Sequence, residues 1–435
     1  MNAFWSFLYN LVITAVIRFV LPIASIFNSK IKESVQNRKN WFSSLQAELG
    51  KLDPRRKRIL FHCPSAGEWA QAVPIIETIK KSNPAIDIIA SFLSPSGYNF
   101  FKGHSDLAFK VYLPFDSRSN AFRFLRSVNP DLWIISKYDV WPNHLMAAQK
   151  LRIPVIMTSA LLSEKSRRGK GFSKHLNRQI YRIFQLIFPV SEADYQRFLQ
   201  IYPYPERLFT MGSTGFDQVY NHSLITQGKE KLSLFKTSSA DDVIFIGGSI
   251  WPSDEVHLMP ALIECLGQYQ NLKAILAPHE PHEKHILDIE NTLRQANIKS
   301  QRYTDVANTG GSSERVIIIN TIGMLAKIYH QTDIAYVGGS CGPGVHNVTE
   351  PAVFGQAVLF GPRYRNSFEA IALKDQGCGF VIENRQRIKQ ILDQFINDRE
   401  YRNNIGQKAL NLIKAQVGAS DRIVEQIRHH FDFIH

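Results

Sequence analysis

The first segment with residues suited to catalysis is HCPSAGE, at positions 62–68. It overlaps an apolar run, 59–64, of the length of a buried strand, and its last residue, Glu68, would stand at the start of the next helix. A carboxylate in this position can accept the proton of a sugar hydroxyl and act as a general base. A helix-start glutamate stabilised by the helix dipole is the alternative, and it is common. The segment therefore makes Glu68 a candidate base.

A second segment, GGSCGPGVHNVTEPA at positions 338–352, is rich in glycine. Its glycines would let backbone N–H groups approach an anion, and a helix opening at Asn347–Glu350 would favour a phosphate at its N-terminus. Glu350 could accept the hydroxyls of a ribose. The segment lacks both the G-x-G-x-x-G spacing and the P-loop lysine, so it implies neither NAD binding nor ATP hydrolysis. A tight turn is the competing interpretation, but His346 and Asn347 beside the glycines favour a nucleotide site.

Two shorter turns, PHEP at 278–281 and TIGM at 321–324, also follow apolar runs in the second half of the chain. They would lie along the same edge of a parallel sheet, although each alone is a weak signal. We find no H-E-x-x-H, G-x-S-x-G or D-x-D motif. His282 and His285 are interpreted as surface residues, so no metal site is expected.

Short apolar runs alternate with helical patterns from residue 59 onward, which predicts βαβ units with buried parallel strands. The alternation restarts after about residue 240, beyond a weakly periodic stretch, 220–240, interpreted as a linker. The fold class is therefore α/β, with two Rossmann-like domains facing a cleft at the carboxyl ends of their strands. The predicted divisions are an N-terminal membrane anchor (1–30), a first Rossmann-like domain (31–225), a second Rossmann-like domain (226–417) and a C-terminal helix that returns to the first domain (418–435).

Residues 3–27 form an apolar stretch long enough to cross a bilayer. Arg18 and Pro22 interrupt it, so a helix lying in the membrane interface is the alternative to a spanning one, and a buried helix of a soluble protein is a third interpretation. Basic residues follow the stretch, from Lys30 to Lys39, and none precedes it as in a cleaved signal peptide. By the positive-inside rule the rest of the chain would lie in the cytoplasm.

The 435 residues carry 51 Lys and Arg against 38 Asp and Glu, a net charge of +13. Because 44% of the residues are hydrophobic, the chain can bury a core and is not disordered. The basic excess suits phosphate-bearing partners. No nucleic-acid module or aromatic-interleaved basic platform is visible, so lipids and small phosphorylated molecules are favoured over nucleic acid. The four cysteines lack C-x-x-C spacing and fit reduced thiols.

Taken in order, these segments resemble the Kdo transferases, glycosyltransferases that attach 3-deoxy-D-manno-octulosonic acid (Kdo) to lipid A. The resemblance covers essentially the whole chain and begins with the N-terminal apolar stretch. The matching segments are HCPSAGEWAQAVPII (62–76, similar to H-x-x-S-x-G-E), YLPFDSRSNAFRFLRSVNPDL (112–132), WPN (141–143), SALLSEKS (159–166), GSTGFD (212–217) and GGSCGPGVHNVTEPA (338–352).

The resemblance implies a GT-B fold and an inverting, metal-independent transfer of Kdo from the co-substrate CMP-Kdo to lipid IVA, with no cofactor. It places the protein among the lipids of a bacterial inner membrane, at the cytoplasmic face. It makes residues 31–225 the acceptor domain and residues 226–417 the nucleotide-sugar donor domain. Glu68 would be the proton acceptor. The residues that it assigns to the donor CMP are His279, Glu280, Ile322, Gly323, Met324, Gly338, Gly339, Ser340, Gly344, His346, Asn347, Val348, Thr349 and Glu350.

Four positions, Lys137, Leu161, Gly215 and His279, depart from the charges of the family's pattern. Lys137 and Asp139 stand where Glu-x-Glu is frequent, and they are predicted to stabilise charge in the transition state. Leu161 and Gly215 replace basic residues, and His279 replaces an arginine. Lys137 could supply the charge that Gly215 lacks. These departures leave two alternatives open: a GT-B enzyme with a UDP-type donor, or an inactive membrane-bound binding protein.

Overall fold

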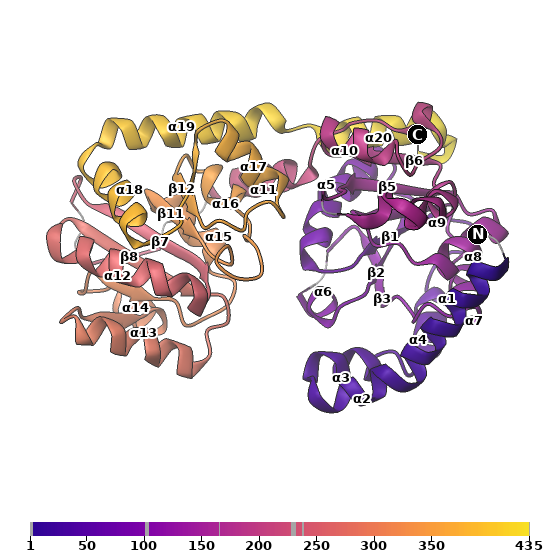
Figure 1. Cartoon of the computed structure of the whole chain (residues 1–435), viewed down its shortest axis with the longest axis horizontal. Helices are drawn as coiled ribbons and strands as arrows, with labels where there is room; N and C mark the ends of the chain where they lie inside the picture. The colour runs from indigo at the N-terminus through magenta and orange to yellow at the C-terminus, as the bar shows by residue number, and fades with distance from the viewer. Residues whose placement is uncertain (1–2, 101–103, 165, 228–231, 237–238, 435) are drawn as a thin grey trace. The chain divides into compact units, whose positions relative to one another are not determined.

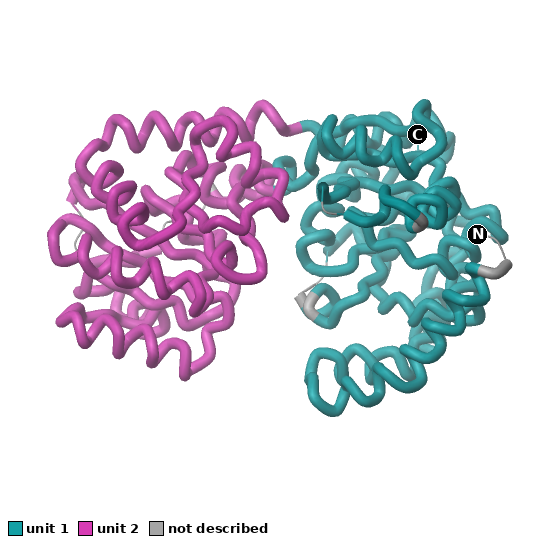
Figure 2. Tube along the Cα trace, viewed as in Figure 1, with its two compact units in different colours: residues 1–218, 418–435 teal, residues 219–417 magenta. Residues whose placement is uncertain are grey.

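The computed structural model describes residues 3–434 except 101–103, 165, 228–231 and 237–238 (Figure 1). The chain forms two compact units, which are coloured separately in Figure 2. Unit 1 comprises Met1–Gln218 and Gly418–His435, and unit 2 comprises Val219–Val417. Each unit contains one parallel sheet with helices between its strands, so the predicted α/β architecture is confirmed.

The sheet of unit 1 has the strand order β3-β2-β1-β4-β5-β6. The order reverses between β1 and β4, and such a switch point is where open α/β sheets bind ligands. The strands are β1 (Arg58–Cys63), β2 (Asp87–Phe92), β3 (Leu107–Tyr112), β4 (Leu132–Ser136), β5 (Val155–Ala160) and β6 (Leu186–Pro189). The helices after the N-terminal segment are α4 (Trp41–Leu49), α5 (Ala66–Ser82), α6 (Pro95–Phe100), α7 (Arg118–Val128), α8 (Pro142–Leu151), α9 (Gly171–Tyr181), α10 (Glu192–Phe198), α11 (Thr214–Gln227) and α20 (Ala419–His430).

Unit 2 repeats this plan with the order β13-β12-β11-β7-β8-β10-β9, so its switch point lies between β7 and β11. Its strands are β7 (Val243–Ile250), β8 (Leu272–Pro278), β9 (Ser300–Arg302), β10 (Val316–Ile318), β11 (Ile334–Val337), β12 (Ala357–Phe360) and β13 (Gly379–Val381). Its helices are α12 (Pro252–Gln268), α13 (Glu283–Gln295), α14 (Tyr303–Thr309), α15 (Leu325–Ile328), α16 (Thr349–Ala352), α17 (Phe368–Asp375), α18 (Arg385–Asn397) and α19 (Arg399–Gln416).

Helix α5 shows how the sequence builds the element that carries Glu68. The Ser65 side chain accepts a hydrogen bond from the Gly67 amide and caps the helix. Trp69, Ala72 and Ile76 recur at helical spacing and are buried against the sheet. The apolar face thereby fixes the rotation of the helix and the direction in which its first turn points.

The chain passes between the units through α11 and the stretch after α19. Because α11 continues to Gln227, the first part of the expected linker, 220–227, is helical rather than irregular. Helix α20 belongs to unit 1: the Arg422 guanidinium donates to the Met211 carbonyl, and Asp217 accepts from the Gly418 amide at 2.6 Å.

The N-terminal segment is helical from α1 (Ala3–Ala15) through a π-helical turn (Val16–Val20) to α2 (Leu21–Phe27). Proline removes one helical N–H, and a wider turn next to Pro22 accommodates that loss. The Asn28 side chain then caps α3 (Ser29–Gln36) by accepting from two backbone amides. Residues Trp5–Phe27 are long and apolar enough to cross a membrane, judged by length and composition only.

Candidate active site and donor site

Glu68 and Lys137 lie at the carboxyl ends of two neighbouring strands of unit 1. β1 ends at Cys63, and Glu68 stands in the first turn of the following helix α5. Lys137 comes directly after β4 and has a positive φ of 64°. Its Nζ lies 2.9 Å from Oε1 of Glu68, and the Ser65 hydroxyl donates to Oε2. Two of the predicted site residues therefore meet at the switch point of the sheet.

The environment of Glu68 keeps its carboxylate charged. Its side chain is only 14% exposed and that of Lys137 only 20%. Burial alone raises the pKa of Glu68, but the Lys137 ammonium and the Ser65 hydrogen bond outweigh it, and the net pKa lies below the usual value. Glu68 is thus ionised at neutral pH, as a proton acceptor must be.

Asp139 lies beside this ion pair but points into a separate network. Its Oδ2 is 2.7 Å from Nε2 of the fully buried His62 and accepts from Nε1 of Trp141 at 2.8 Å. The other His62 nitrogen, Nδ1, lies 3.0 Å from the Ser91 hydroxyl. Burial raises the pKa of Asp139, yet the contacts with His62 and Trp141 leave it below its usual value. The carboxylate therefore holds the segment 137–141 against β1.

The segment that contains Gly215 reaches the same edge of the sheet. The Lys137 amide donates to the Thr158 carbonyl at 2.8 Å, and the neighbouring Ser159 hydroxyl lies 2.9 Å from that of Thr214. Lys137 and Gly215 are therefore joined through two residues at the end of β5. Whether the charge of Lys137 replaces one missing at position 215 stays a prediction.

In unit 2, three aromatic rings stack where β7 and β8 end. Trp251 follows β7 and His279 follows β8, and their ring centroids are 4.7 Å apart. His346 stacks on His279 at 4.4 Å, and Trp251 Nε1 donates to His346 Nε2 at 2.8 Å. Burial and the neighbouring imidazole of His279 lower the pKa of His346 to about 4. His279 and His346, both predicted donor residues, are thus brought together.

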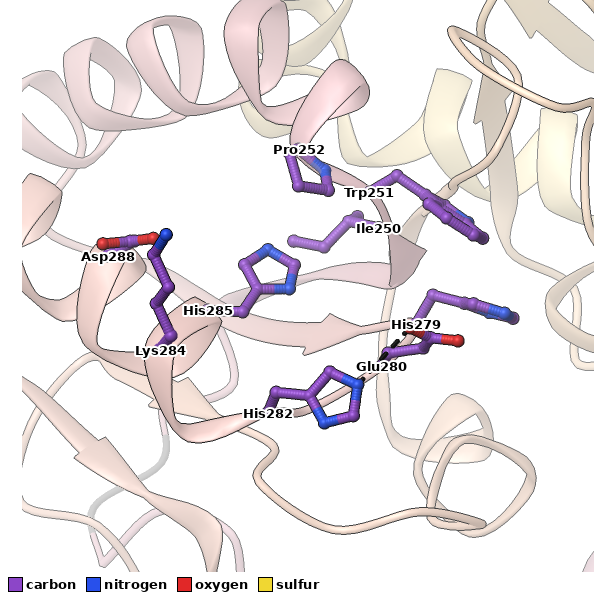
Figure 3. Close-up of a pocket in the computed structure, with 9 residues that line it drawn as sticks. All are labelled: Ile250, Trp251, Pro252, His279, Glu280, His282, Lys284, His285 and Asp288. Atoms are coloured by element: carbon purple, nitrogen blue, oxygen red, sulfur yellow. Dashed lines mark ion pairs between the residues drawn. The ribbon is translucent and has the colours of Figure 1, made fainter. Parts of the chain in front are cut away.

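The ring stack borders a cavity of about 400 Å³. Figure 3 shows Trp251 and His279 on one side of it and Lys284 and Asp288 on the other. This volume is within the range of small-molecule sites. Glu280, also predicted for the donor site, lines the same cavity, where His282 Nε2 is 3.4 Å from its Oε2.

A buried carboxylate that the sequence analysis missed organises the glycine-rich loop. Asp254, in the first turn of α12, is 1% exposed. Its Oδ2 accepts from the amides of Gly339 at 2.7 Å and Trp251 at 2.9 Å. Its Oδ1 accepts from the Tyr336 hydroxyl at 2.8 Å and the Cys341 amide at 3.1 Å. Asp254 thus ties the ends of β7 and β11 together behind the loop.

The amides of this loop are engaged within the protein. Those of Gly342 and Gly344 both donate to the Gly339 carbonyl at 2.9 Å, and that of His346 donates to the Gly338 carbonyl at 3.1 Å. The loop therefore does not offer these amides to an anion, contrary to the expectation from the sequence. Its glycines serve close packing instead: a Cβ on Gly338 would lie 2.2 Å from the Ser249 carbonyl oxygen.

The expected helix at Asn347–Glu350 is a single turn, α16, which begins at Thr349. Four residues align few peptide dipoles, so the prediction of a helix N-terminus that favours a phosphate is wrong. Asn347 Nδ2 donates to Glu350 Oε1 at 3.1 Å, while Val348 and Thr349 are buried. Burial raises the pKa of Glu350 to about 7, although the Asn347 hydrogen bond opposes this. Glu350 thus titrates near neutral pH.

The remaining predicted donor residues lie in the turn after β10 and in the glycine-rich loop. Ile322 and Gly323 form the turn after β10, where Ile322 is 83% exposed and Gly323 has a φ of 85°. Met324 follows them and packs against the core of unit 2. Ser340 is fully buried, and its hydroxyl oxygen accepts from the Gly361 amide at 2.6 Å, so its side chain is structural.

Trp251 and Asp254 also carry a sequence signal that could have been found. WPSD (251–254) follows a predicted strand with proline at the first helical position and an acid two residues later. The structure has the corresponding capping box, in which Asp254 accepts from the Trp251 amide. His62 needed the structure, because its partner Asp139 is far away in the sequence.

The fold places the chain in a class of known structures. The chain superposes on a UDP-GlcNAc 2-epimerase from Neisseria meningitidis with a TM-score of 0.61 at 15% identity, covering 85% of this chain and 99% of the other. A glycosyltransferase from Rickettsia africae gives 0.57 at 11% identity, covering 86% and 98%. At these identities the likeness concerns the fold, which is α/β and GT-B-like as predicted.

The sequence comparisons then give the family. The profile of the 3-deoxy-D-manno-octulosonic-acid transferase (kdotransferase) family matches residues 36–218. The chain is 23% identical to the 3-deoxy-D-manno-octulosonic acid transferase of Haemophilus influenzae over 98% of this chain and 99% of the relative. It is 24% identical to that of Chlamydophila psittaci over 85% and 84%. Over most of its length the chain is therefore similar, at low identity, to glycosyltransferases of the Kdo transferase family.

Proposed function

We propose that the protein transfers Kdo from CMP-Kdo to lipid IVA in lipopolysaccharide core biosynthesis, with inversion and without a metal. The observation that carries this proposal is the ionised Glu68 at the switch point of unit 1, in the segment that matches the family's H-x-x-S-x-G-E. The Glu68 carboxylate accepts the proton of the acceptor hydroxyl while that oxygen bonds to the anomeric carbon of Kdo. The bond from that carbon to the CMP phosphate breaks at the same time, and CMP leaves with the electron pair.

We assign the donor to unit 2. His279 and His346 stand beside the glycine-rich loop, where imidazole N–H groups can meet the phosphate and carboxylate of CMP-Kdo. Glu350 accepts the ribose hydroxyls in its ionised form. The loop amides are already bonded within the protein, so side chains must recognise the donor. His279 and His346 thereby replace the arginine that the family's pattern has at position 279.

Lys137 is assigned two tasks. It holds Glu68 ionised until the acceptor hydroxyl arrives, and it offers a positive charge at the edge where Gly215 has none. Asp139 keeps Lys137 in place through the network with His62 and Trp141, and so acts as a positioning residue.

The membrane setting supports the same assignment. A lipid acceptor explains why the chain carries an apolar helical segment, Trp5–Phe27, and phosphates on both substrates suit a protein with a net charge of +13. We therefore place the protein at the inner membrane of a bacterium, on the cytoplasmic face.

The test is a transfer assay on the full chain in detergent, with lipid IVA and freshly generated CMP-Kdo, followed by mass spectrometry of the lipid. A gain of one or more Kdo units is expected. Transfer from a UDP-sugar but not from CMP-Kdo would replace this proposal by the UDP-type enzyme. No transfer from either donor, with a control enzyme active in the same tube, would leave a binding protein.

A further inference from the structure

A polar seam holds the N-terminal apolar helix to unit 1. Three side chains on one face of α1 bond to three side chains of the folded unit: Tyr9 donates to Asp116 Oδ2 at 2.7 Å, the amides of Asn10 and Asn143 donate to each other at 3.1 Å, and Arg118 donates to the Ser6 hydroxyl at 2.6 Å. Burial and the nearby Asp116 carboxylate raise the pKa of Tyr9, which therefore stays a hydrogen-bond donor. The seam is fully paired and leaves no reason for α1 to detach.

The partners of the seam are also held by contacts within the rest of unit 1. Asp116 is 2% exposed, and its Oδ1 lies 2.6 Å from Nδ1 of His144 and accepts from the His144 amide at 3.0 Å. Asn143 is also 2% exposed, and its amide donates to Asp116. Both residues lie in segments that match the family pattern, YLPFD and WPN, yet the proposed chemistry gives neither a role. A seat for α1 is such a role.

The chain that follows the apolar segment also bonds to unit 1, close to Asp116. Asn37 donates to the Tyr112 hydroxyl at 3.1 Å, and the buried Arg38 donates from Nε to the Leu113 carbonyl at 2.7 Å. Leu113 and Asp116 are three residues apart, at most about 10 Å. A bilayer's hydrocarbon core is about 30 Å thick. Tyr9, near the start of the segment, and Arg38, beyond its end, are thus bonded to one short stretch of unit 1, and both bonds cannot persist if the segment crosses a bilayer.

The other face of the segment is apolar and exposed. Within the described part of the chain, nine of the fifteen exposed large hydrophobic side chains belong to it: Phe7, Leu8, Leu11, Val12, Phe19, Val20, Ile23, Ile26 and Phe27. Arg18 is exposed on the same face. In a spanning helix Arg18 would sit near mid-bilayer at high cost, whereas in an interfacial helix its guanidinium reaches phosphates. Figure 1 shows the segment, in indigo, following unit 1 past α7 and α8.

We propose that Trp5–Phe27 lies on one surface of the membrane instead of crossing it, with its polar face on the Asp116–Asn143 seat and its apolar face among the lipid headgroups and upper acyl chains. The exposed Lys30, Lys32 and Lys39 that follow fit anionic lipids. The segment 137–143 joins this seat to Lys137 within at most about 21 Å of chain. If the proposed function holds, the seam therefore keeps Glu68 within reach of the membrane surface that carries the acceptor lipid.

Cross-linking in native membranes tests the seat. The full chain with Asn10→Cys and Asn143→Cys is treated with a short bis-maleimide, in membranes and in detergent, with each single variant as background control. The pair Phe19→Cys and Asn143→Cys is the matched control, because Phe19 is 65% exposed and nine residues further along. We expect the first pair to cross-link in both settings and the second in neither. Cross-linking of the first pair in detergent but not in membranes, or in neither setting, would overturn the proposal.

The accessibility of single cysteines to a thiol reagent is an independent measurement. It leaves the seam residues unchanged. An Ala3→Cys variant and a Ser29→Cys variant are treated with a membrane-impermeant maleimide in spheroplasts and in inverted vesicles, with the wild-type chain as background. We expect both positions to react only in inverted vesicles. Reaction of position 3 in spheroplasts and of position 29 in inverted vesicles would show a spanning helix. Neither experiment measures sugar transfer, so their failure would leave the proposed function standing.

Discussion

The Nζ of Lys137 lies 2.9 Å from Oε1 of Glu68 and joins the ends of the adjacent strands β4 and β1. The ion pair has opposing consequences for a base: it keeps the carboxylate charged, and it makes that carboxylate less basic. The balance favours the charged form because the Lys137 ammonium and the Ser65 hydrogen bond outweigh the effect of burial on the pKa of Glu68. An uncharged neighbour would leave burial to raise the pKa of Glu68 instead.

Replacement of Lys137 by methionine should therefore move the acidic limb of the transfer rate. The nearby charge lowers the pKa of Glu68, so in the Lys137→Met variant activity should fall off at a higher pH than in the wild type. The measurement is kcat/KM against pH for the full chain. Lys51→Met, at an exposed surface ion pair, is the matched control. If activity falls off at the same pH in both variants, Lys137 does not control the ionisation of Glu68.

The variant Glu68→Gln keeps the size of the side chain but cannot accept a proton. We expect transfer to fall by about 10²–10⁴-fold, which is typical for loss of a general base. Stabilisation of the protein by CMP in a thermal melt should persist, since the donor is assigned to unit 2. Glu77→Gln on the same helix should transfer normally. Wild-type transfer by Glu68→Gln would remove Glu68 from the proposed mechanism.

Periodicity was sufficient for most of the fold. Most buried strands of the two sheets are runs of Ile, Val, Leu and Phe, the pattern from which the βαβ units were predicted. Two strands give a weaker signal: β6 (Leu186–Pro189) has only four residues, and β9 (Ser300–Arg302) is a polar edge strand without an apolar pattern. The stretch 220–227 was interpreted as a linker because its helix, α11, has no clear apolar face.

The sites were less predictable because their contacts join distant segments. Residues after strand ends could be named from order alone, and the pairing of Glu68 with Lys137 follows from β1 and β4 being neighbours. Asp254 accepts four hydrogen bonds, and the amides of the glycine-rich loop are bonded to carbonyls of the same loop. Both arrangements depend on tertiary geometry, which cannot be inferred from the spacing of residues in the sequence. Arg38 shows the same limit: it belongs to a basic cluster in the sequence, yet it is buried on backbone carbonyls.

Asp254 should contribute strongly to the stability of unit 2. Asparagine has nearly the same shape, but its NH₂ group cannot accept, so donors now bonded to one carboxylate oxygen lose their acceptor in a buried place. Buried unsatisfied groups cost about 1–3 kcal/mol each, so Asp254→Asn should lower the free energy of unfolding by about 3 kcal/mol. The measurement is denaturant unfolding. Asp375→Asn, at an exposed position, should stay within about 0.5 kcal/mol of wild type, and an equal result for both variants would contradict the assigned role.

Nucleotide binding should depend on pH through Glu350. Its pKa is about 7, so its carboxylate is mostly neutral at pH 6 and mostly ionised at pH 8. Because the ionised form accepts ribose hydroxyls better, CMP should bind more tightly as pH rises through 7, by up to about tenfold per unit below that value. Calorimetry on wild type and Glu350→Gln checks this. The titration of the CMP phosphate is common to both proteins, so equal pH dependence in the two would exclude Glu350.

His346 should make the protein less stable in mild acid. Its Nε2 accepts from Trp251, so protonation there would replace an acceptor by a donor and break that bond. Its pKa is about 4 in the folded protein and near 6.5 in the unfolded chain, which therefore binds an extra proton between these values. The contribution of His346 to the free energy of unfolding is complete above pH 6.5 and is lost as pH falls toward 4. The loss at pH 5 is at most about 2 kcal/mol. His346→Gln retains an acceptor for Trp251 without the titration, so its unfolding midpoint should fall less than that of wild type between pH 7.5 and pH 5. Equal falls would show that His346 is already accessible to protons in the folded state.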